Sequence, residues 1–329
     1  MSRIEVVGLG AMNMDYLCHV ESILQDGEAA IKEFALSPGG SAANTVYGLA
    51  KLGHGAGFIG AVGDDENGQL LTRSLRHAGV DTSRIKVMRG ANSGMVVALS
   101  DTLGRRSLYV LTGANCLLSL DATDVECVNQ AELLHLSSFA DSVQFDASID
   151  LVRRLKPSVK ISFAPGALYA TLGLRNLASV LERTDILFLN RSEIQELTDL
   201  DVMAGAEVCL KSGVRTVVVT LGAGMEIQTG KGARRRTVNA LSYIRDSRRE
   251  YFIEGNVSNE MKLVEATGAG DAFAAGFLHG WLSKKDWQTC GLLGDLAARF
   301  SMRKLGAREG LPTVGQLSRR YQSLYKEKP

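Results

Sequence analysis

Hydrophobic and polar positions follow two alternating patterns along most of this chain. Short apolar runs are separated by segments with the spacing of amphipathic helices. The run Thr216–Thr220 has three valines between two threonines, as expected for a strand that is covered on both faces. The predicted strands are Glu5–Leu9, Ala56–Val62, Ser93–Ser100, Leu133–Ser137, Lys160–Phe163, Ile186–Asn190 and Thr216–Thr220. The predicted helices are Ser41–Leu52, Gly68–Ala78, Gln144–Leu155, Leu174–Glu182, Glu193–Leu197, Asp201–Lys211 and Ala272–Ser283. This alternation predicts an α/β fold with a mostly parallel sheet and helices on both faces.

Three stretches depart from the alternation. Asp15–Pro38 and Gly90–Thr112 each resemble short strands with polar turns, and together they could form a small projecting sheet that acts as a lid. Gln228–Lys262 is irregular, and its arginines could form an anion-binding or partner-binding surface. These arginines are Arg234, Arg235, Arg236, Arg245, Arg248 and Arg249. Because acidic residues are interleaved beyond Arg236, a solvated β-hairpin insertion is the favoured interpretation.

Composition narrows the class of protein. The chain has 329 residues with 37 Lys+Arg against 36 Asp+Glu, so its global charge favours neither nucleic acid nor a membrane surface as a partner. The apolar runs are too short to span a bilayer, and Met1–Val7 lacks the apolar core of a signal peptide. The five cysteines are dispersed without CxxC spacing, which indicates reduced thiols in a cytoplasmic protein and no zinc site.

The most informative segment is Thr267–Asp271. Its Gly-Ala-Gly turn precedes a helix of small residues, so several backbone N–H groups lack intrahelical partners and point one way. With the positive end of the helix dipole they form a site for an anion such as a phosphoryl group. The Asp271 carboxylate would repel phosphate unless it had another task, and accepting a proton from an attacking hydroxyl is such a task. The segment therefore predicts phosphoryl transfer to an alcohol.

A second segment contains adjacent glycines, Gly39 and Gly40, before an alanine-rich helix. Glycines allow the backbone to approach a ligand closely, although a plain turn explains them too. Asn44 in the first turn of that helix offers a donor and an acceptor to a hydroxylated ligand. Upstream, Asn13 and Asp15 have strand spacing and so face one side, where they could bind vicinal hydroxyls. A loop-capping role for Asp15 is the alternative.

Two further strand ends carry polar or glycine-rich segments. Asn190 and Glu193 could organise a hydrated Mg²⁺ ion and phosphate, or they could be a helix cap with a first-turn acid; both interpretations stay open. The segment Thr220–Gly224 follows a buried run as a predicted glycine-rich loop, which suits nucleotide phosphates or a plain turn.

The Gly39-Gly40 segment, Asn190–Glu193, Thr220–Gly224 and Thr267–Asp271 follow one another in the same order as similar segments of the ribokinase-like PfkB carbohydrate kinases. The resemblance extends from Val6 to Pro312. Leu111–Asn115 is similar to the Gly-Ala-Asn segment that follows the lid in that family. Ser162–Gly166 and Gly306–Pro312 look more like the archaeal nucleoside-kinase branch. The resemblance implies a three-layer α/β/α core with a small β-sheet lid. It implies a single domain over residues 1–329, with the lid formed by residues 15–38 and 90–112.

The resemblance also implies an ATP-dependent kinase that phosphorylates a hydroxymethyl group of a sugar or nucleoside. Asp271 would be the base, and the N–H groups of Gly268, Ala269, Gly270 and Asp271 would form the anion hole. Asn13, Asp15, Gly39, Gly40 and Asn44 would bind the acceptor. Asn190, Thr220, Gly222, Gly224 and Thr267 would bind the nucleotide, and Glu193 would serve Mg²⁺. Family analogy alone suggests a homodimer that forms through the lid.

The chain departs from the family at four positions. Glu265 and Ala266 stand where the family often has Asp and Thr, and Gly310 lacks a side-chain oxygen. Because these positions contribute to a monovalent-cation site in many relatives, K⁺ activation is doubtful for this chain. Ala164 replaces a common Asp, which removes a carboxylate near the site.

Other functions fit the sequence less well. A dinucleotide-dependent oxidoreductase would need glycine at position 13 after Gly8-Leu9-Gly10, and that residue is Asn13. The chain lacks the GxxxxGK[ST] pattern of a P-loop kinase. The remaining alternative is a non-catalytic sugar- or nucleoside-binding regulator on the same fold. The presence of Asp271 favours catalysis.

Overall fold

The fold is built around a nine-stranded sheet. We describe residues 3–103, 105–229, 236–255 and 264–329 of a computed structural model. The strand order across this sheet is β13-β12-β11-β10-β9-β8-β1-β4-β5. The strands are β1 (Val6–Leu9), β4 (Ala56–Gly63), β5 (Asp81–Met88), β8 (Leu133–Ser137), β9 (Lys160–Ala164), β10 (Ile186–Asn190), β11 (Thr216–Thr229), β12 (Arg236–Asp246) and β13 (Glu250–Ile253). Neighbouring strands from β5 through β11 are parallel, as predicted, while the pairs β11–β12 and β12–β13 are antiparallel.

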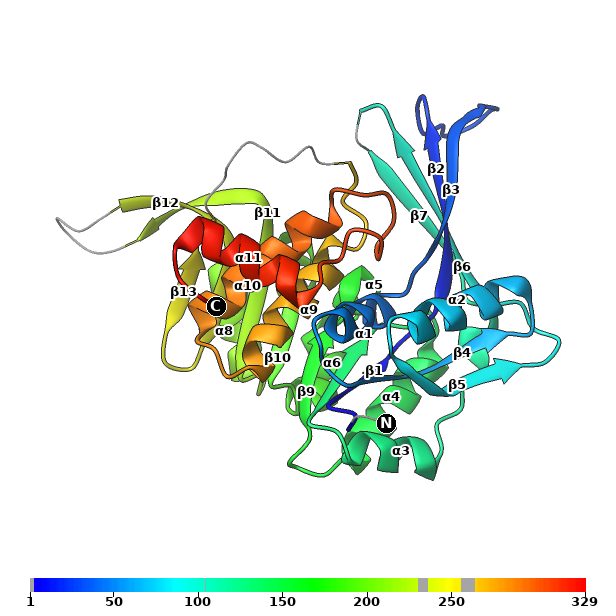
Figure 1. The fold of residues 1–329 in the computed structure, drawn as a ribbon, viewed down its shortest axis with the longest axis horizontal. Coiled ribbons are helices and arrows are strands. Elements are labelled where there is room, and N and C mark those ends of the chain that lie inside the picture. The colour runs from blue at the N-terminus through cyan, green and yellow to red at the C-terminus, as the bar shows by residue number, and fades with distance from the viewer. Residues whose placement is uncertain (1–2, 104, 230–235, 256–263) are drawn as a thin grey trace.

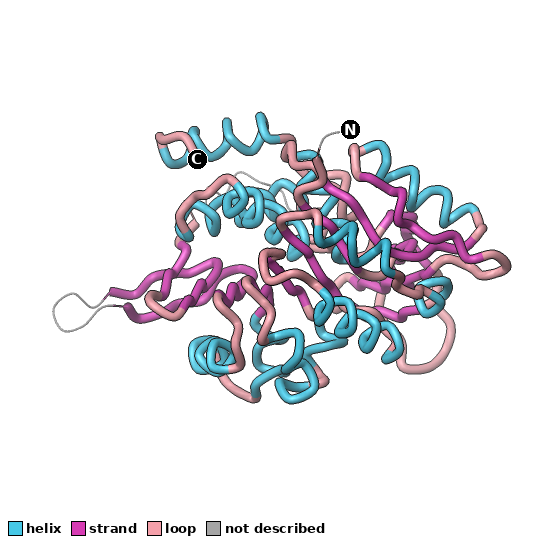
Figure 2. Tube along the Cα trace, turned by 90° about the horizontal axis from the view of Figure 1, so that it is seen from below, coloured by secondary structure: helices cyan, strands magenta, loops and turns pink. Residues whose placement is uncertain are grey.

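Helices cover both faces of this sheet (Figure 2). On one face lie α1 (Ser41–Lys51), α2 (Glu66–His77), α9 (Ala269–Leu282), α10 (Trp287–Ser301) and α11 (Val314–Tyr325). On the other lie α3 (Ala122–Asn129), α4 (Ser142–Arg154), α5 (Gly166–Ala170), α6 (Gly173–Leu181), α7 (Arg191–Thr198), α8 (Val202–Lys211) and the 3₁₀ turn η1 (Gly113–Leu117). Alternate strand residues serve the two faces: Val217 and Val219 pack into one core and Val218 into the other. The predicted three-layer α/β architecture is confirmed.

A second, four-stranded sheet projects from the core (Figure 1). Its order is β3-β2-β6-β7, with β2 (Asn13–Val20), β3 (Ile31–Pro38), β6 (Gly94–Asp101) and β7 (Arg106–Leu111). We call it the projecting sheet. Its central pair, β2 and β6, is parallel, and the outer pairs are antiparallel. The predicted strand Ser93–Ser100 forms β6 and so belongs to this sheet, whereas the strand beside β4 is β5.

The structure corrects two predictions about the end of the central sheet. Thr220–Gly224 was expected to be a loop, but β11 runs through it with a bulge between Thr220 and Met225, and pairs with β12 on both sides. The described part of Gln228–Lys262 is not irregular: β12 and β13 pair as an antiparallel hairpin, in agreement with the favoured interpretation, and this hairpin extends the central sheet. Arg234 and Arg235 lie outside the described residues. In the part of the chain that the structure describes, no helix has the length and apolar character needed to cross a bilayer.

Strand β1 occupies a special place in the sheet. The chain leaves β1 toward β4 on one side and later returns to β8 on the other, so the strand order reverses at β1. In open α/β sheets, ligands bind at such a reversal, outside the carboxyl ends of the strands. Those ends face the base of the projecting sheet, since β2 begins four residues after β1 ends.

Candidate active site

Two cavities lie at the carboxyl ends of the central strands. The large cavity, about 440 Å³, is lined by Ala11, Ser138 and Gly166, which follow β1, β8 and β9, and by side chains of the projecting sheet. The small cavity, about 120 Å³, is lined by residues at the end of β10, by Thr220 beside the bulge of β11, and by residues of α9. The two cavities adjoin, because both are lined by Ser41, Ser138, Gly166, Glu193 and Asp271.

Asp271 lies in the first turn of α9, in the wall between the two cavities. One carboxylate oxygen, Oδ1, accepts a hydrogen bond from Ser41 Oγ at 2.8 Å. The other, Oδ2, accepts one from Asn44 Nδ2 at 2.8 Å. Burial raises the pKa of Asp271 to about 6, against the opposing effects of these two donors and of the Arg308 charge. The carboxylate is therefore held in a fixed orientation, with a pKa suited to proton exchange near neutral pH.

The turn before α9 depends on Gly268. Its φ of 73° is left-handed, and a Cβ at this position would lie 2.5 Å from the Cβ of Ala307. The Ala269 N–H donates to the carbonyl of Ala266 at 3.1 Å, so one of the four N–H groups expected in an anion hole is already paired. Gly268 lines the large cavity and Gly270 lines the small one.

Asn13 and Asp15 lie on β2 and line the large cavity, each about nine-tenths buried. Gly39 makes room for Asp15, because a Cβ on Gly39 would lie 2.3 Å from an Asp15 carboxylate oxygen. Gly40 has a φ of 101°, and a Cβ there would lie 2.2 Å from the Ala11 carbonyl oxygen. The two adjacent glycines therefore let β2 and the start of α1 (Ser41–Lys51) meet at the cavity.

The electrostatics of Asp15 resemble those of Asp271. Burial raises the pKa of Asp15 to about 7, and the negative charges of Asp271 and Glu265 add to this effect. The positive charges of Arg308 and Arg106 oppose it. Asp15 lines the large cavity but not the small one, which separates its position from that of Asp271.

Asn190 and Glu193 form a reciprocal helix cap at the start of α7. Asn190 Oδ1 accepts from the Glu193 N–H at 2.9 Å, and the Asn190 N–H donates to Glu193 Oε2 at 2.8 Å. The helix cap, one of the two interpretations of this pair, is therefore present. Glu193 nonetheless lines both cavities, and burial, with a smaller contribution from the Asp271 charge, raises its pKa.

The small cavity includes some of the other predicted nucleotide residues and not others. Asn190 and Thr220 line it, while Thr267 lines the large cavity. Gly222 and Gly224 line neither cavity, because they lie in the bulge of β11. The described residues contain no group of three or more His, Cys, Asp or Glu side chains that could hold a metal. A single carboxylate such as Glu193 fits an ion like Mg²⁺, which binds mainly through water and phosphate oxygens.

Thr267 connects the projecting sheet to the turn before α9. Its Oγ1 accepts a hydrogen bond from Arg106 Nη2 on β7 at 2.6 Å. The same hydroxyl donates to the Glu265 carboxylate. The second carboxylate oxygen of Glu265 accepts from the Gly306 N–H at 3.0 Å. Both oxygens of Glu265 are thus bonded within the protein.

Two residues that complete this site were not predicted from the sequence. Ser41 is hydrogen-bonded to Asp271, and Arg308 is a buried arginine, 2% exposed, bonded to the side chain of Asn44. Ser41 follows the two glycines directly, and this position was the signal that could have identified it. Arg308 follows Gly306-Ala307, but no local pattern indicates that this arginine is buried.

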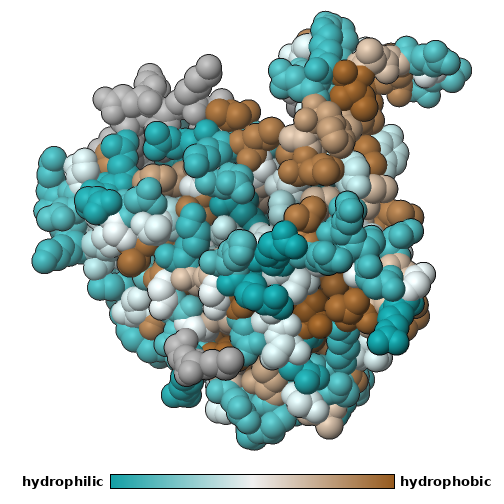
Figure 3. Space-filling model, turned by 45° about the vertical axis from the view of Figure 1, so that its right-hand side comes forward, coloured by the Kyte–Doolittle hydropathy of each residue, from teal (hydrophilic) through white to brown (hydrophobic). Residues whose placement is uncertain are grey.

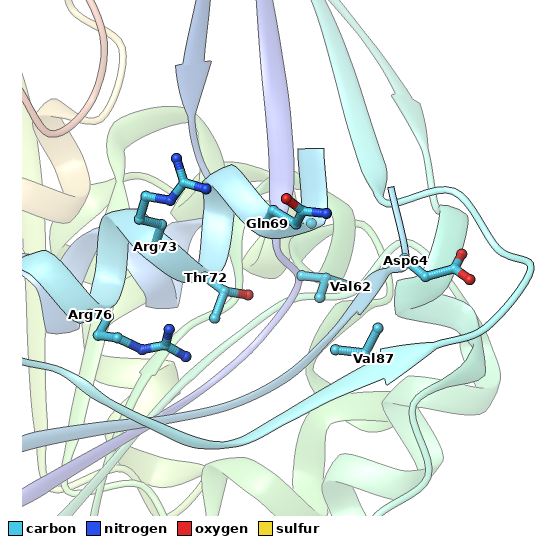
Figure 4. Close-up of a pocket in the computed structure, with 9 residues that line it drawn as sticks. Val62, Asp64, Gln69, Thr72, Arg73, Arg76 and Val87 are labelled. Atoms are coloured by element: carbon cyan, nitrogen blue, oxygen red, sulfur yellow. The ribbon is translucent and has the colours of Figure 1, made fainter. Parts of the chain in front are cut away.

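A separate pocket of about 380 Å³ lies between α2 and strands β4 and β5 (Figure 4). Thr72, Arg73 and Arg76 of α2 line it together with Val62 and Val87. None of its lining residues lines either of the two cavities. None of the residues predicted from the sequence to form the site lies in this pocket.

Comparison with known proteins decides the family. Residues 3–314 match the model of the pfkB family carbohydrate kinases. The chain belongs to this family. An uncharacterized sugar kinase of Archaeoglobus fulgidus is 36% identical over 266 residues, covering 80% of this chain and 98% of that protein. An ATP-dependent ribose-1-phosphate kinase of Halopiger xanaduensis is 30% identical over 315 residues, covering 94% and 96%.

Solved structures of a nucleoside kinase and a ribokinase share the fold. The nucleoside kinase of Methanocaldococcus jannaschii has a TM-score of 0.78 at 22% identity, covering 99% of this chain and 100% of that one. The Arabidopsis thaliana ribokinase in complex with ribose and ATP has a TM-score of 0.79 at 23% identity, covering 95% and 97%. As a member of the pfkB family, the chain is a carbohydrate or nucleoside kinase.

Proposed function

We propose that this kinase transfers the γ-phosphoryl group of ATP to a hydroxymethyl group of a sugar or nucleoside, with Asp271 as the general base. One observation carries the proposal: the Asp271 carboxylate lies in the wall shared by the two cavities, in the first turn of α9. A base at that place reaches an acceptor in one cavity while the helix N-terminus beside it attracts the phosphoryl group.

The acceptor occupies the large cavity. Asn13, Asp15 and Asn44 hold its hydroxyl groups, and Gly39 and Gly40 allow the close approach of the backbone. The reacting hydroxyl passes its proton to Asp271 as its oxygen bonds to the γ-phosphorus. The bond from that phosphorus to the bridging oxygen breaks, and ADP leaves with the electron pair.

The N–H groups at the start of α9, from Gly268 to Asp271, stabilise the charge of the transferring group. Gly270 and Asp271 have their N–H groups in the first turn, where helical N–H groups lack carbonyl partners. The Ala269 N–H would have to exchange its bond to Ala266 for one to phosphate.

The nucleotide phosphates lie along the small cavity, near Asn190 and Thr220, and Thr267 would contact the nucleotide from the adjoining large cavity. A magnesium ion would neutralise phosphate charge and would be held by Glu193 through water. The raised pKa of Glu193 supports this role, because an unneutralised buried carboxylate favours a nearby cation. Gly222 and Gly224 do not line this cavity, so they would contact only a part of the nucleotide that extends beyond it.

We propose no K⁺ requirement. Both carboxylate oxygens of Glu265 already accept a hydrogen bond within the protein, one from Thr267 and one from the Gly306 N–H. The same contacts hold the two adjoining loops together without an ion.

The projecting sheet, formed by residues within 15–38 and 90–112, would act as a lid on a single domain spanning residues 1–329. It would also serve as the interface of a homodimer. Apolar side chains gather on it (Figure 3), and those exposed by more than two-fifths of their surface are Ile31, Phe34, Leu36, Leu108, Tyr109, Val110 and Leu111. A cytoplasmic location is supported by the five cysteines, all of which are free.

The activity is tested with a panel of acceptors. ADP release with Mg²⁺-ATP is measured for ribose, ribose 1-phosphate, fructose and several nucleosides, with ATP alone as the control. The proposal expects one class to stimulate ADP release and to yield a phosphorylated product by mass spectrometry. If no sugar or nucleoside does so while the protein still binds ADP, the non-catalytic regulator is the better account.

A further inference from the structure

Arg308 is a fully buried guanidinium in the loop between α10 and α11. Its Nε donates to Asn44 Oδ1 at 2.8 Å, its Nη1 to Ser74 Oγ at 3.0 Å, and its Nη2 to the Gly39 carbonyl at 2.9 Å. The ring of Tyr47 lies 5.5 Å from the guanidinium carbon. A buried charge is costly unless its donors are satisfied, and here each of the three guanidinium nitrogens has an acceptor.

The three acceptors come from three separate segments, of which the first two belong to the site. Gly39 belongs to the adjacent glycines beside Asp15, Asn44 lies on α1, and Ser74 lies on α2. Arg308 does not line either cavity. It therefore acts through other residues and does not touch a ligand.

The contact with Asn44 determines which way the amide of that residue points. A guanidinium has donors and no acceptor, so the group that faces it must be the amide oxygen. The amide nitrogen then faces Asp271, and its N–H bonds to Oδ2 at 2.8 Å. If the amide were reversed, an oxygen would face the carboxylate and an N–H would face the guanidinium, and both contacts would be repulsive.

We propose that Arg308 is a positioning residue, which fixes the Asn44 amide so that it orients the Asp271 carboxylate and which places one positive charge behind that carboxylate. This inference rests on the proposed phosphotransferase function of the same site. It adds a residue that binds neither acceptor nor nucleotide.

The charged groups around the site shift the pKa of Arg308, and Arg308 shifts theirs in turn. Asp15 on β2 and Asp271 on α9 both favour the charged form of Arg308, and burial opposes it, with the result that its pKa falls to about 10. Arg308 in turn lowers the pKa of Asp15, Tyr47 and Asp271. Three further charged groups interact electrostatically with these two carboxylates. Arg106 on β7 and Glu265 before α9 interact with Asp15, and Glu193 on α7 interacts with Asp271.

The test compares Arg308→Gln and Arg308→Lys with Ser74→Ala as the matched control. Ser74→Ala removes one bond of Arg308 but leaves Asn44 and Gly39 in place. Each variant is checked by circular dichroism and ADP binding. Then kcat, the two KM values and the pH dependence of kcat/KM are measured with the acceptor that the wild-type enzyme uses.

Arg308→Gln is expected to lower kcat by about tenfold or more with little change in KM for ATP, and to move the acid limb of kcat/KM to higher pH. Arg308→Lys keeps the charge with a single donor group. It is expected to retain the wild-type acid limb but to lower kcat, because Asn44 is no longer held by the planar guanidinium. Ser74→Ala is expected to change neither quantity.

A folded Arg308→Gln variant with wild-type kcat and acid limb would overturn the proposal. So would a Ser74→Ala variant that shows the same shift. If Arg308→Gln does not fold, Arg308→Lys decides, and a wild-type kcat in that variant overturns the proposal. These outcomes are separate from failure of the proposed function, in which the wild-type protein itself transfers no phosphoryl group.

Discussion

The side-chain amide of Asn44 donates a hydrogen bond to the carboxylate of Asp271 over 2.8 Å, between the first turn of α1 and the first turn of α9. The two residues are 227 positions apart in the chain. The bond brings together the glycine-rich start of α1 and the anion site at the start of α9. It also assigns Asn44 a role in orienting the base, in addition to any contact with the acceptor.

Asn44→Asp is expected to impair catalysis through this contact. Aspartate keeps an acceptor for Arg308 but places a second carboxylate against Asp271, so one of the two binds a proton more tightly. The acid limb of kcat/KM should rise by about one pH unit. Thr45→Val is the control on the same helix, because it removes a bond to the Asp271 backbone carbonyl but none to the Asp271 carboxylate, and it should leave the acid limb in place. An unchanged limb in Asn44→Asp would contradict the assigned role.

The wild-type pH profile should show an acid limb near pH 6. Burial raises the pKa of Asp271 to about 6, and only the deprotonated carboxylate can accept a proton. Activity should therefore be lost as the pH falls through this value. The measurement is kcat/KM for the acceptor from pH 5 to 9 at saturating Mg²⁺-ATP, with enzyme stability checked at each pH. A profile that stays flat down to pH 5 would argue against Asp271 as the base.

Gly268→Ala should destabilise the protein and reduce kcat. The φ of 73° is unfavourable for alanine, and its Cβ would lie 2.5 Å from Ala307 Cβ, so we expect a loss of about 1–3 kcal/mol. Gly270→Ala is the matched stability control, because a Cβ there meets nothing within 4 Å. Thermal and urea unfolding compare the two. Equal stability of both variants would show that the turn tolerates a side chain.

Replacing K⁺ should not change the rate. Both oxygens of Glu265 are bonded to groups of the protein, so no ion is needed to join the loops at residues 265 and 306. We expect kcat to be the same in potassium, sodium and choline chloride at equal ionic strength. Strong activation by K⁺ alone would show that another set of oxygens binds the cation.

Local patterns in the sequence predicted much of the fold and part of the site. The valine-rich run at Thr216 and the helix after Gly270 are specified by their own residues, and both elements are found. The spacing of Asn13 and Asp15 on one strand likewise places both on the cavity. The bulge in β11 could not be predicted, because pairing with β12 continues the strand through a glycine-rich segment that by itself favours a loop.

Long-range contacts explain what was missed. Arg308 has acceptors 234 to 269 positions away in the chain, so its burial depends on the packing of α1, α2 and the glycine segment against one loop. The Asn190–Glu193 pair shows the reverse case. A local cap pattern fully explains these residues, yet the fold also turns Glu193 toward both cavities.

Asp271→Asn provides the most direct test of the central claim, and the variant should fold. An asparagine can accept from Asn44 and donate to Ser41 Oγ, so both contacts have partners. Because the pKa of Asp271 is raised in the folded protein, the charged carboxylate costs stability as the pH rises from about 4 to above 6, and the neutral amide removes that cost. Thermal stability at pH 8 should not fall.

Phosphoryl transfer by Asp271→Asn is then measured in a single turnover with radiolabelled ATP, beside the dissociation constant for ADP. The account predicts a loss of rate of at least about 10²-fold with ADP binding nearly unchanged. A variant that binds ADP and transfers the phosphoryl group at close to the wild-type rate would contradict the assignment of Asp271 as the base.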